Sequence, residues 1–228
     1  MRRQFKIIQK GVIALLLLFC LTLKGQINRV LNPSFEQYTI CGGFSGDCTG
    51  SSINFWESPS HGSPDWFDTC WGGIPSNYQG HQYPRTGNAY AGIVMFSTTI
   101  NGDGYEYIEG QLSNGLIGGK EYCVTYYVSL ADTECFAVSD LGAYLSISSV
   151  CKPNTVDTLP YIPQILNPST NLLSDKIDWV PVSGEFTASG GEQYITIGRF
   201  DSINPYIYVG GGASNCIPVG GEVEPTII

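Results

Sequence analysis

Apolar and polar positions alternate along much of the chain after residue 26. The clearest case is Glu121–Ala131, in which Tyr122 and every second residue after it are apolar, while the intervening positions are more polar. Successive strand side chains point to opposite faces of a sheet, so the set that begins at Tyr122 is expected in the core. The same pattern predicts five more strands: Asn88–Phe96, Tyr105–Leu112, Leu141–Ser148, Trp179–Thr187 and Gln193–Phe200.

Turn residues separate these segments, and the chain contains 28 glycines. No long apolar stripe with the helical period of 3.6 residues follows residue 26. The stretch Ser189-Gly190-Gly191-Glu192 predicts a tight hairpin between the last two strands. Internal repeats and linkers are absent from the sequence. The pattern therefore predicts an all-β fold, an antiparallel β-sandwich, with residues 27–228 forming one domain.

Two stretches break the strand pattern. Residues 41–85 are rich in Gly, Pro, Ser and aromatic residues and contain both histidines, whereas residues 151–174 are rich in Pro, Asn and Leu. Long irregular segments are uncommon inside a compact domain and often carry function. We therefore expect a functional site in the aromatic-rich stretch.

The first 26 residues have the features of a secretory signal peptide. A basic segment with Arg2, Arg3, Lys6 and Lys10 precedes an apolar run of thirteen residues, Gly11–Leu23, and Gly25 lies near a plausible cleavage point. The alternative is an uncleaved anchor helix, but thirteen residues are few for a membrane span. The mature protein is expected to be exported to the periplasm, the cell surface or the medium, with no membrane insertion after cleavage.

Charge separates strongly between the two parts of the chain. Five of the eleven Lys and Arg residues and none of the twenty Asp and Glu residues lie in residues 1–26, so the remainder carries a formal charge of 6 − 20 = −14. This charge argues against binding to nucleic acid or to an anionic membrane surface. It suits an exported protein with a solvated acidic surface, or one that binds divalent cations.

Seven cysteines follow residue 26: Cys41, Cys48, Cys70, Cys123, Cys135, Cys151 and Cys216. Export permits disulfides, and the odd number leaves at least one thiol unpaired within the chain. Cys41 and Cys48 flank a glycine-rich hexapeptide, which makes a local disulfide between them the favoured pair. Because no C-x-x-C spacing occurs and there are only two histidines, a zinc site is not expected.

Four motifs occur in a recognisable order: VLNPSFEQY (30–38), RTGNAYAGI (85–93), GLIGGKEYCVTYYVSLAD (115–132) and DWVPVSGEFTASGGEQYITIGRF (178–200). Together they resemble the galactose-binding-like jelly-roll β-sandwich of many carbohydrate-binding modules. The nearest likeness is to modules in secreted or surface proteins of gliding-type Gram-negative bacteria. This resemblance implies a fold more specifically than it implies a ligand.

The resemblance also implies a role for Glu36, which follows an Asn-Pro turn in what is expected to be the first strand. In such modules a glutamate at this place commonly helps to hold a structural calcium, beside the loop that carries Asn88. Calcium prefers carboxylate and carbonyl oxygens. Glu36 is therefore the first metal candidate and Asn88 the second. The alternative is a glutamate that faces solvent on an edge strand.

The C-terminal sequence departs from the resemblance. These modules usually end in a strand whose aspartate can help to hold the metal, but here residues 206–209 are followed by glycine-rich sequence without that aspartate. The final strand is therefore expected to be missing or replaced. The departure weakens the inference of calcium and predicts an exposed strand edge.

A glycan-binding site would use aromatic rings, onto which sugars stack their apolar faces. Candidates in the irregular region are Trp71, Trp56, Tyr78 and Tyr83, and candidates on the strands are Tyr127 and Tyr144. For each of them the alternative role is ordinary packing, because large aromatic residues often cap a sandwich core. Trp66, within the SPDWF segment, is expected to be scaffold, and Trp71 is the first choice for a ligand contact.

Catalytic motifs have little support. Ser45 lies in a sequence close to the nucleophile elbow, but Asp47 stands where the second glycine is required. Glu106 and Glu109 are three residues apart on a predicted strand and point to opposite faces, which does not suit a glycosidase pair. The sequence thus favours a non-catalytic exported module that binds glycans. The alternative is a structural or adhesive domain, or a fragment of a larger surface protein, without a sugar site.

Overall fold

The computed structural model describes residues 27–95, 104–200, 207–209 and 226–227. The predicted signal peptide and Phe96, the end of one predicted strand, lie outside these residues. Within them the chain contains strands and no helix. The strands are β1 (Trp56–Glu57), β2 (Asp65–Asp68), β3 (Ser76–Asn77), β4 (Gly80–His81), β5 (Ala89–Val94), β6 (Tyr107–Gln111), β7 (Glu121–Val128), β8 (Phe136–Ala137), β9 (Leu141–Ser146), β10 (Ile165–Leu166), β11 (Val180–Thr187), β12 (Tyr194–Arg199), β13 (Ile207–Tyr208) and β14 (Thr226–Ile227).

A five-stranded antiparallel sheet forms one layer, in the order β1-β6-β12-β9-β10. Its central strand β12 is buried at every position after Tyr194. The apolar residues Ile195 and Ile197 belong to the main core cluster, together with Leu141 and Leu145 of β9. This sheet therefore contributes a large part of the main core.

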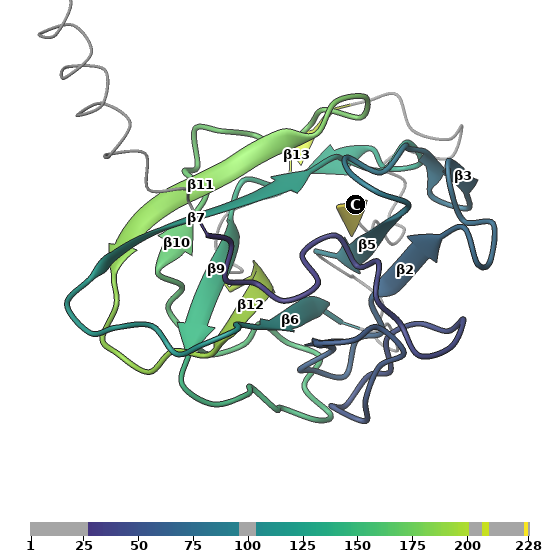
Figure 1. Ribbon diagram of the computed structural model, residues 1–228. Coiled ribbons are helices and arrows are strands. Elements are labelled where there is room, and N and C mark those ends of the chain that lie inside the picture. Colours follow the sequence, from purple (N-terminus) through teal and green to yellow (C-terminus); the bar gives the residue numbers. More distant parts are fainter. Residues whose placement is uncertain (1–26, 96–103, 201–206, 210–225, 228) are drawn as a thin grey trace, which may run out of the picture.

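Strands β7 and β11 pair along eight residues each and form a long ribbon across that sheet (Figure 1). The alternation predicted for β7 is confirmed, since Tyr122, Val124 and Tyr126 pack against the main core while Cys123 and Thr125 are exposed. A second group of strands, β14-β5-β2, contributes Trp66, Ala89 and Ile93 to the main core cluster. The described chain is thus an all-β antiparallel sandwich, as the sequence predicts.

The C-terminal residues contribute two short strands. β13 pairs with β8, and β14 pairs with β5 through Thr226 opposite Val94 and Ile227 opposite Ile93. Consequently β5 has a hydrogen-bonded neighbour on each side, β14 and β2. These short pairings occupy the place at which the sequence predicts a missing or replaced final strand.

A small satellite core supports the irregular region. Phe67 of β2, Tyr90 of β5 and Ala131 form this cluster, and Ile74 and Trp179 pack against it. Phe67 and Tyr90 are tilted rings with centroids 5.2 Å apart. Because segments 65–90 and 131–179 share this cluster, loops that are distant in the sequence are fixed at one end of the sandwich.

The segment around Glu36 is a turn rather than the first strand that the sequence predicts. Val30 makes only an isolated bridge to Leu112, and Asn32 and Phe35 have positive φ angles of 49° and 60°. The buried Asn32 side chain holds the turn, since its amide donates to the Gln37 carbonyl and its oxygen accepts the Gln37 N–H. Asparagine tolerates this conformation and satisfies its backbone locally, so the Asn-Pro pair turns the chain.

The predicted hairpin at 189–192 is also wrong. The turn exists, and the Glu192 carboxylate accepts the backbone N–H groups of Ser189 and Gly190. However, it joins strands of different sheets, because β11 pairs with β7 whereas β12 pairs with β6 and β9. The local sequence specifies the turn, but the longer-range pairing of each strand decides its sheet.

The disulfides differ from the predicted Cys41–Cys48 pair. Cys41 is bonded to Cys70 and Cys48 to Cys151, and Cys135 is also disulfide-bonded. Residues 38–53 fold back on themselves through backbone hydrogen bonds, which leave Cys48 near the tip of this excursion and Cys41 on its first arm. Each cysteine therefore meets a distant partner. Such bonds are compatible with export.

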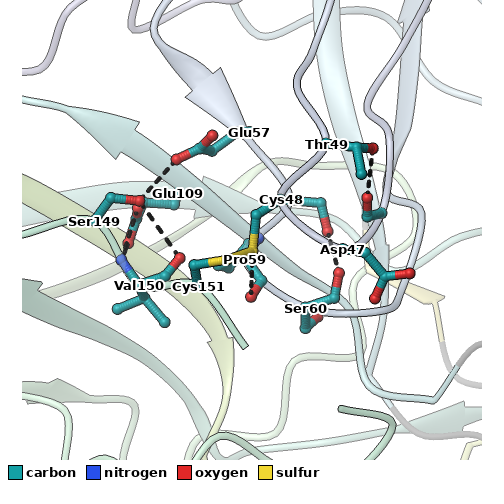
Figure 2. Close-up of a disulfide and its surroundings, with 12 residues drawn as sticks. Asp47, Cys48, Thr49, Glu57, Pro59, Ser60, Glu109, Ser149, Val150 and Cys151 are labelled. Atoms are coloured by element: carbon teal, nitrogen blue, oxygen red, sulfur yellow. Dashed lines mark hydrogen bonds between the residues drawn. A yellow bond between two sulfur atoms is a disulfide. The ribbon is translucent and has the colours of Figure 1, made fainter. Parts of the chain in front are cut away.

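Figure 2 shows the Cys48–Cys151 disulfide beside two carboxylates that meet across strands. Glu57 of β1 lies opposite Glu109 of β6, and its Oε1 accepts the hydroxyl hydrogen bond of Ser149. Glu109 is 1% exposed and accepts the N–H of Val150 and the hydroxyl of Thr196. Burial raises the Glu109 pKa, and the hydrogen bonds oppose that rise.

Glu106, by contrast, serves another part of the structure. Its carboxylate accepts the N–H groups of Ser63 and Val94, whereas the Glu109 carboxylate accepts that of Val150. The two side chains therefore hold different segments, as expected for residues on opposite faces of an extended chain. Both are buried and anchor the backbone.

Candidate functional site

A pocket of about 500 Å³ lies at the end of the sandwich that the satellite core supports. Three segments line it: residues 81–85 at and after β4, Asp132 after β7, and Lys176, Ile177 and Trp179 before β11. We call it the Arg85 pocket. Its lining residues are His81, Gln82, Tyr83, Pro84, Arg85, Asp132, Lys176, Ile177 and Trp179. The pocket combines aromatic rings, amide groups and charges of both signs, as ligand sites commonly do.

The ring of Tyr127 supports Arg85. Tyr127 alternates with the core-facing residues of β7, and the Cζ atom of Arg85 lies 3.4 Å from the centroid of its ring. An arginine stacked on a tyrosine at an exposed site gains about 0.5–1 kcal/mol. Stacking occupies one flat face of the guanidinium, and the N–H groups lie in its plane. The side chain is therefore ordered while its donors are still able to meet a ligand.

Lys176 is the second cation of the pocket. Its ammonium group donates hydrogen bonds to the backbone carbonyl of Asp132 at 3.0 Å and to that of Glu134. An ammonium group has three donors, so two carbonyls do not exhaust it. Burial lowers the Lys176 pKa, and the nearby carboxylates of Asp132 and Glu134 oppose that change.

Aromatic residues form the wall beside these cations. The indole N–H of Trp179 donates to the backbone carbonyl of Tyr83 at 2.9 Å, which fixes the loop against the start of β11. Tyr90 packs edge-on against Trp179 with ring centroids 5.8 Å apart. Burial raises the pKa of Tyr90 to about 12, so this tyrosine is neutral at physiological pH. The Tyr83 ring itself is 67% exposed and is free to meet a ligand.

Asp132 and His81 connect the pocket to the β3–β4 pair. The Asp132 carboxylate accepts the backbone N–H of His81 at 2.8 Å. The His81 ring meets the Tyr83 ring edge-on at 5.3 Å, and its Nδ1 is 2.9 Å from the Ser76 hydroxyl. Ser76 and His81 are direct cross-strand partners, so strand pairing accounts for this contact. The other histidine, His61, binds Asp47 through Nδ1 at 3.0 Å.

Two more predicted aromatic residues are exposed outside the pocket lining. Trp71 is 69% exposed and lies after the end of β2. Its backbone N–H donates a hydrogen bond to the Asp68 carboxylate. Tyr78 is 66% exposed, packs on Phe67 and donates its hydroxyl hydrogen bond to Asp65. Both rings therefore offer surface near the segment that leads to the pocket.

Two predicted ligand residues have other roles. Trp56 is 5% exposed, and its indole N–H donates to the Asn32 carbonyl at 2.9 Å, so it is a core residue. Tyr144 is half-buried and stacks on Tyr161, with ring centroids 4.6 Å apart, against a second apolar cluster. Trp66 is buried, as the sequence predicts for a scaffold residue. Trp56 fails as a ligand candidate because its ring fills the core.

Glu36 lies beside the loop that carries Asn88, as the resemblance implies. Its Oε1 accepts the Asn88 backbone N–H at 2.6 Å, and both residues are exposed. Gly87 has a φ of 68°, a left-handed backbone conformation that favours glycine, and it lies directly beside the end of the Glu36 side chain. Within the described part of the chain, no three His, Cys, Asp or Glu residues form a group suited to a metal ion.

The sequence reasoning found Tyr83 and Tyr127 but missed the cations and Trp179. Arg85 opens one of the four motifs and Trp179 lies at the start of another, where both read as markers of the fold. Lys176 has no local signal at all. The available clue was the scarcity of basic residues, since residues 27–228 contain only six and Arg85 and Lys176 are two of them.

No protein-family model matches the chain, and no curated protein matches it. Among the described residues there is also no helix long and apolar enough to cross a membrane. The function is therefore argued from the residues of the site.

Proposed function

We propose that this protein is a non-catalytic, exported module of the galactose-binding-like type that binds glycans in the Arg85 pocket. The observation that carries the proposal is the pocket itself, in which an exposed tyrosine ring adjoins amide, carboxylate and cationic groups. Sugars present apolar C–H faces and hydroxyl groups, so a site for them needs both features. Tyr83 supplies the ring, and Gln82, Asp132 and Arg85 supply polar groups.

Two further features support this reading. The motifs that resemble carbohydrate-binding modules supply Arg85 and Trp179, so the resemblance and the pocket coincide in the sequence. Trp71 and Tyr78 expose additional rings on the segment that leads to the pocket. A calcium ion at Glu36, with Asn88 nearby, is part of the proposal as a structural element.

The test is a glycan-array screen of residues 27–228, with calcium and with EDTA, followed by calorimetry on any ligand found. Tyr83→Ala should weaken binding about tenfold or more, equivalent to about 1.4 kcal/mol, without a matching loss of stability. The control is Tyr38→Ala, which removes a partly exposed tyrosine that does not line the pocket. A wild-type protein that binds no glycan would refute the proposal and favour a structural or adhesive domain. Binding unaffected by Tyr83→Ala would place the site elsewhere.

A further inference from the structure

Lys and Arg residues are scarce after residue 26, and two of them line the Arg85 pocket. Residues 27–228 have six Lys and Arg against twenty Asp and Glu, yet two of the six line one pocket. A third, Arg199, is buried in an ion pair with Asp140. An even distribution of these charges would place more carboxylates than cations around such a cavity, whereas here two cations and one carboxylate line it. The grouping of Arg85 with Lys176 therefore requires an explanation.

The Arg85 guanidinium is ordered but not neutralised by its surroundings. Two ion pairs join described residues, His61–Asp47 and Arg199–Asp140, so neither Arg85 nor Lys176 is paired with a carboxylate in that part of the chain. The stack on Tyr127 fixes the Arg85 plane. A planar fork of N–H donors is complementary to a carboxylate or a sulfate, and such charge-assisted hydrogen bonds are short and strong.

Asp132 limits this positive character without cancelling it. The Lys, Arg, Asp and Glu residues that line the pocket are Arg85, Lys176 and Asp132, and their formal charges sum to +1. The Asp132 carboxylate accepts the His81 N–H, and Glu134, whose carboxylate does not line the pocket, also acts on Lys176. The pocket is thus a cationic site within a chain of strongly negative charge.

We propose that the Arg85 pocket recognises an anionic group, a carboxylate or a sulfate, carried by a saccharide. The inference rests on the proposed glycan-binding function and adds the class of sugar. The Arg85 fork binds the anionic group, Lys176 contributes a second positive charge, and the exposed Tyr83 ring stacks on the sugar. A neutral sugar leaves the guanidinium without an anionic partner, so the site discriminates by charge.

The experiment compares saccharides that differ only in charge, by calorimetry with residues 27–228. One pair is oligogalacturonate and its methyl ester, and the other is a sulfated galactan oligosaccharide and its desulfated form. The charged member of one pair should bind about tenfold tighter or more, equivalent to about 1.4 kcal/mol. The pair that shows the preference identifies the anionic group. Raising the salt concentration should reduce the preference, because exposed charges are screened.

Three variants assign the preference to the pocket. Arg85→Gln should remove the preference for the charged member, while Arg85→Lys should retain only part of that preference, because lysine lacks the planar fork. Lys152→Gln removes one positive charge from an exposed lysine that does not line the pocket, so it should change nothing. Melting curves check that each variant is folded.

Equal affinity for both members of each pair would overturn the inference of an anionic group. So would a charge preference that survives Arg85→Gln. In either case neutral-sugar binding that is lost with Tyr83→Ala would still support the proposed glycan-binding function. If no saccharide binds to the wild type, both proposals fail together.

Discussion

The contrast between Trp56 and Trp71 gives a direct test of how the aromatic residues are used. Trp56 is 5% exposed, whereas Trp71 is 69% exposed. The Trp56 ring also lies flat against the backbone of β6, where a Cβ on Gly110 would approach it to 2.7 Å. Removing the ring therefore opens a void beside a residue that has no side chain to fill it. The Asn32 carbonyl would lose its indole donor as well.

The two substitutions should differ severalfold in free energy of unfolding. A buried tryptophan cut to alanine usually costs about 3–5 kcal/mol, and we expect this for Trp56→Ala. About a third of the Trp71 side chain is covered, roughly 80 Å², which at ~25 cal/mol per Å² sets a ceiling of about 2 kcal/mol. Because area-based values are upper bounds, we expect about 1 kcal/mol or less for Trp71→Ala.

Urea unfolding of residues 27–228, followed by far-ultraviolet circular dichroism, measures both values on one scale. The comparison is valid where the slope m is unchanged between variants, which shows that both proteins expose the same area on unfolding. A Trp56→Ala protein that loses less than about 1 kcal/mol would contradict the packing argument. A loss of about 3 kcal/mol or more for Trp71→Ala would show that this ring is scaffold and would remove it from the ligand surface.

Two further predictions concern carboxylates. If calcium binds at Glu36, calcium at a hundred times its dissociation constant should stabilise the wild type by about 2.7 kcal/mol relative to EDTA. Glu36→Ala should abolish that shift and the exposed-strand control Glu121→Ala should keep it; equal stability of the wild type in both buffers would exclude the site. For Glu109, the folded pKa lies above its ordinary value, so the folded state holds the proton more tightly. The stability of the wild type relative to Glu109→Gln should therefore rise as pH falls through the raised pKa toward about 4.5, by about 1.4 kcal/mol per unit of pKa shift. Urea unfolding at several pH values measures this, and a difference that does not change with pH would contradict it.

The long strands were predictable because their signal is local. The predicted strands 121–131, 179–187 and 193–200 correspond to β7, β11 and β12, with ends that differ by at most three residues. Alternate side chains of a strand point to opposite faces of its sheet, so the alternation of apolar residues indicates which face is buried. Burial of that face is the main favourable contribution to the stability of a strand that is covered on one side, such as β7. The sandwich class follows from the number of such segments without any knowledge of their partners.

The errors concern partners that lie far away in the sequence. The Gly190-Gly191 turn has the composition of a hairpin, but β11 finds a full-length partner in β7, and eight paired residues outweigh the preference of a short turn. Cys48 is seven positions from Cys41 and yet bonds to Cys151, across a separation of 103 residues. In both cases the local pattern permits the predicted contact, and the packing of distant segments replaces it.

The candidate site shows the same division between local and distant information. Composition locates aromatic residues in the stretch 41–85, and Tyr83 indeed lines the pocket. The charge of the pocket depends on bringing Arg85 and Lys176 together, and that happens only because segments on both sides of β7 share the cluster of Phe67, Tyr90 and Ala131. The net negative charge of residues 27–228 itself favours both cations, so their presence alone does not require a ligand. The proposal of an anionic ligand rests instead on the hydrogen-bond donors of Arg85 and Lys176, which form no ion pair with a carboxylate within the described residues, more than on the number of exposed rings.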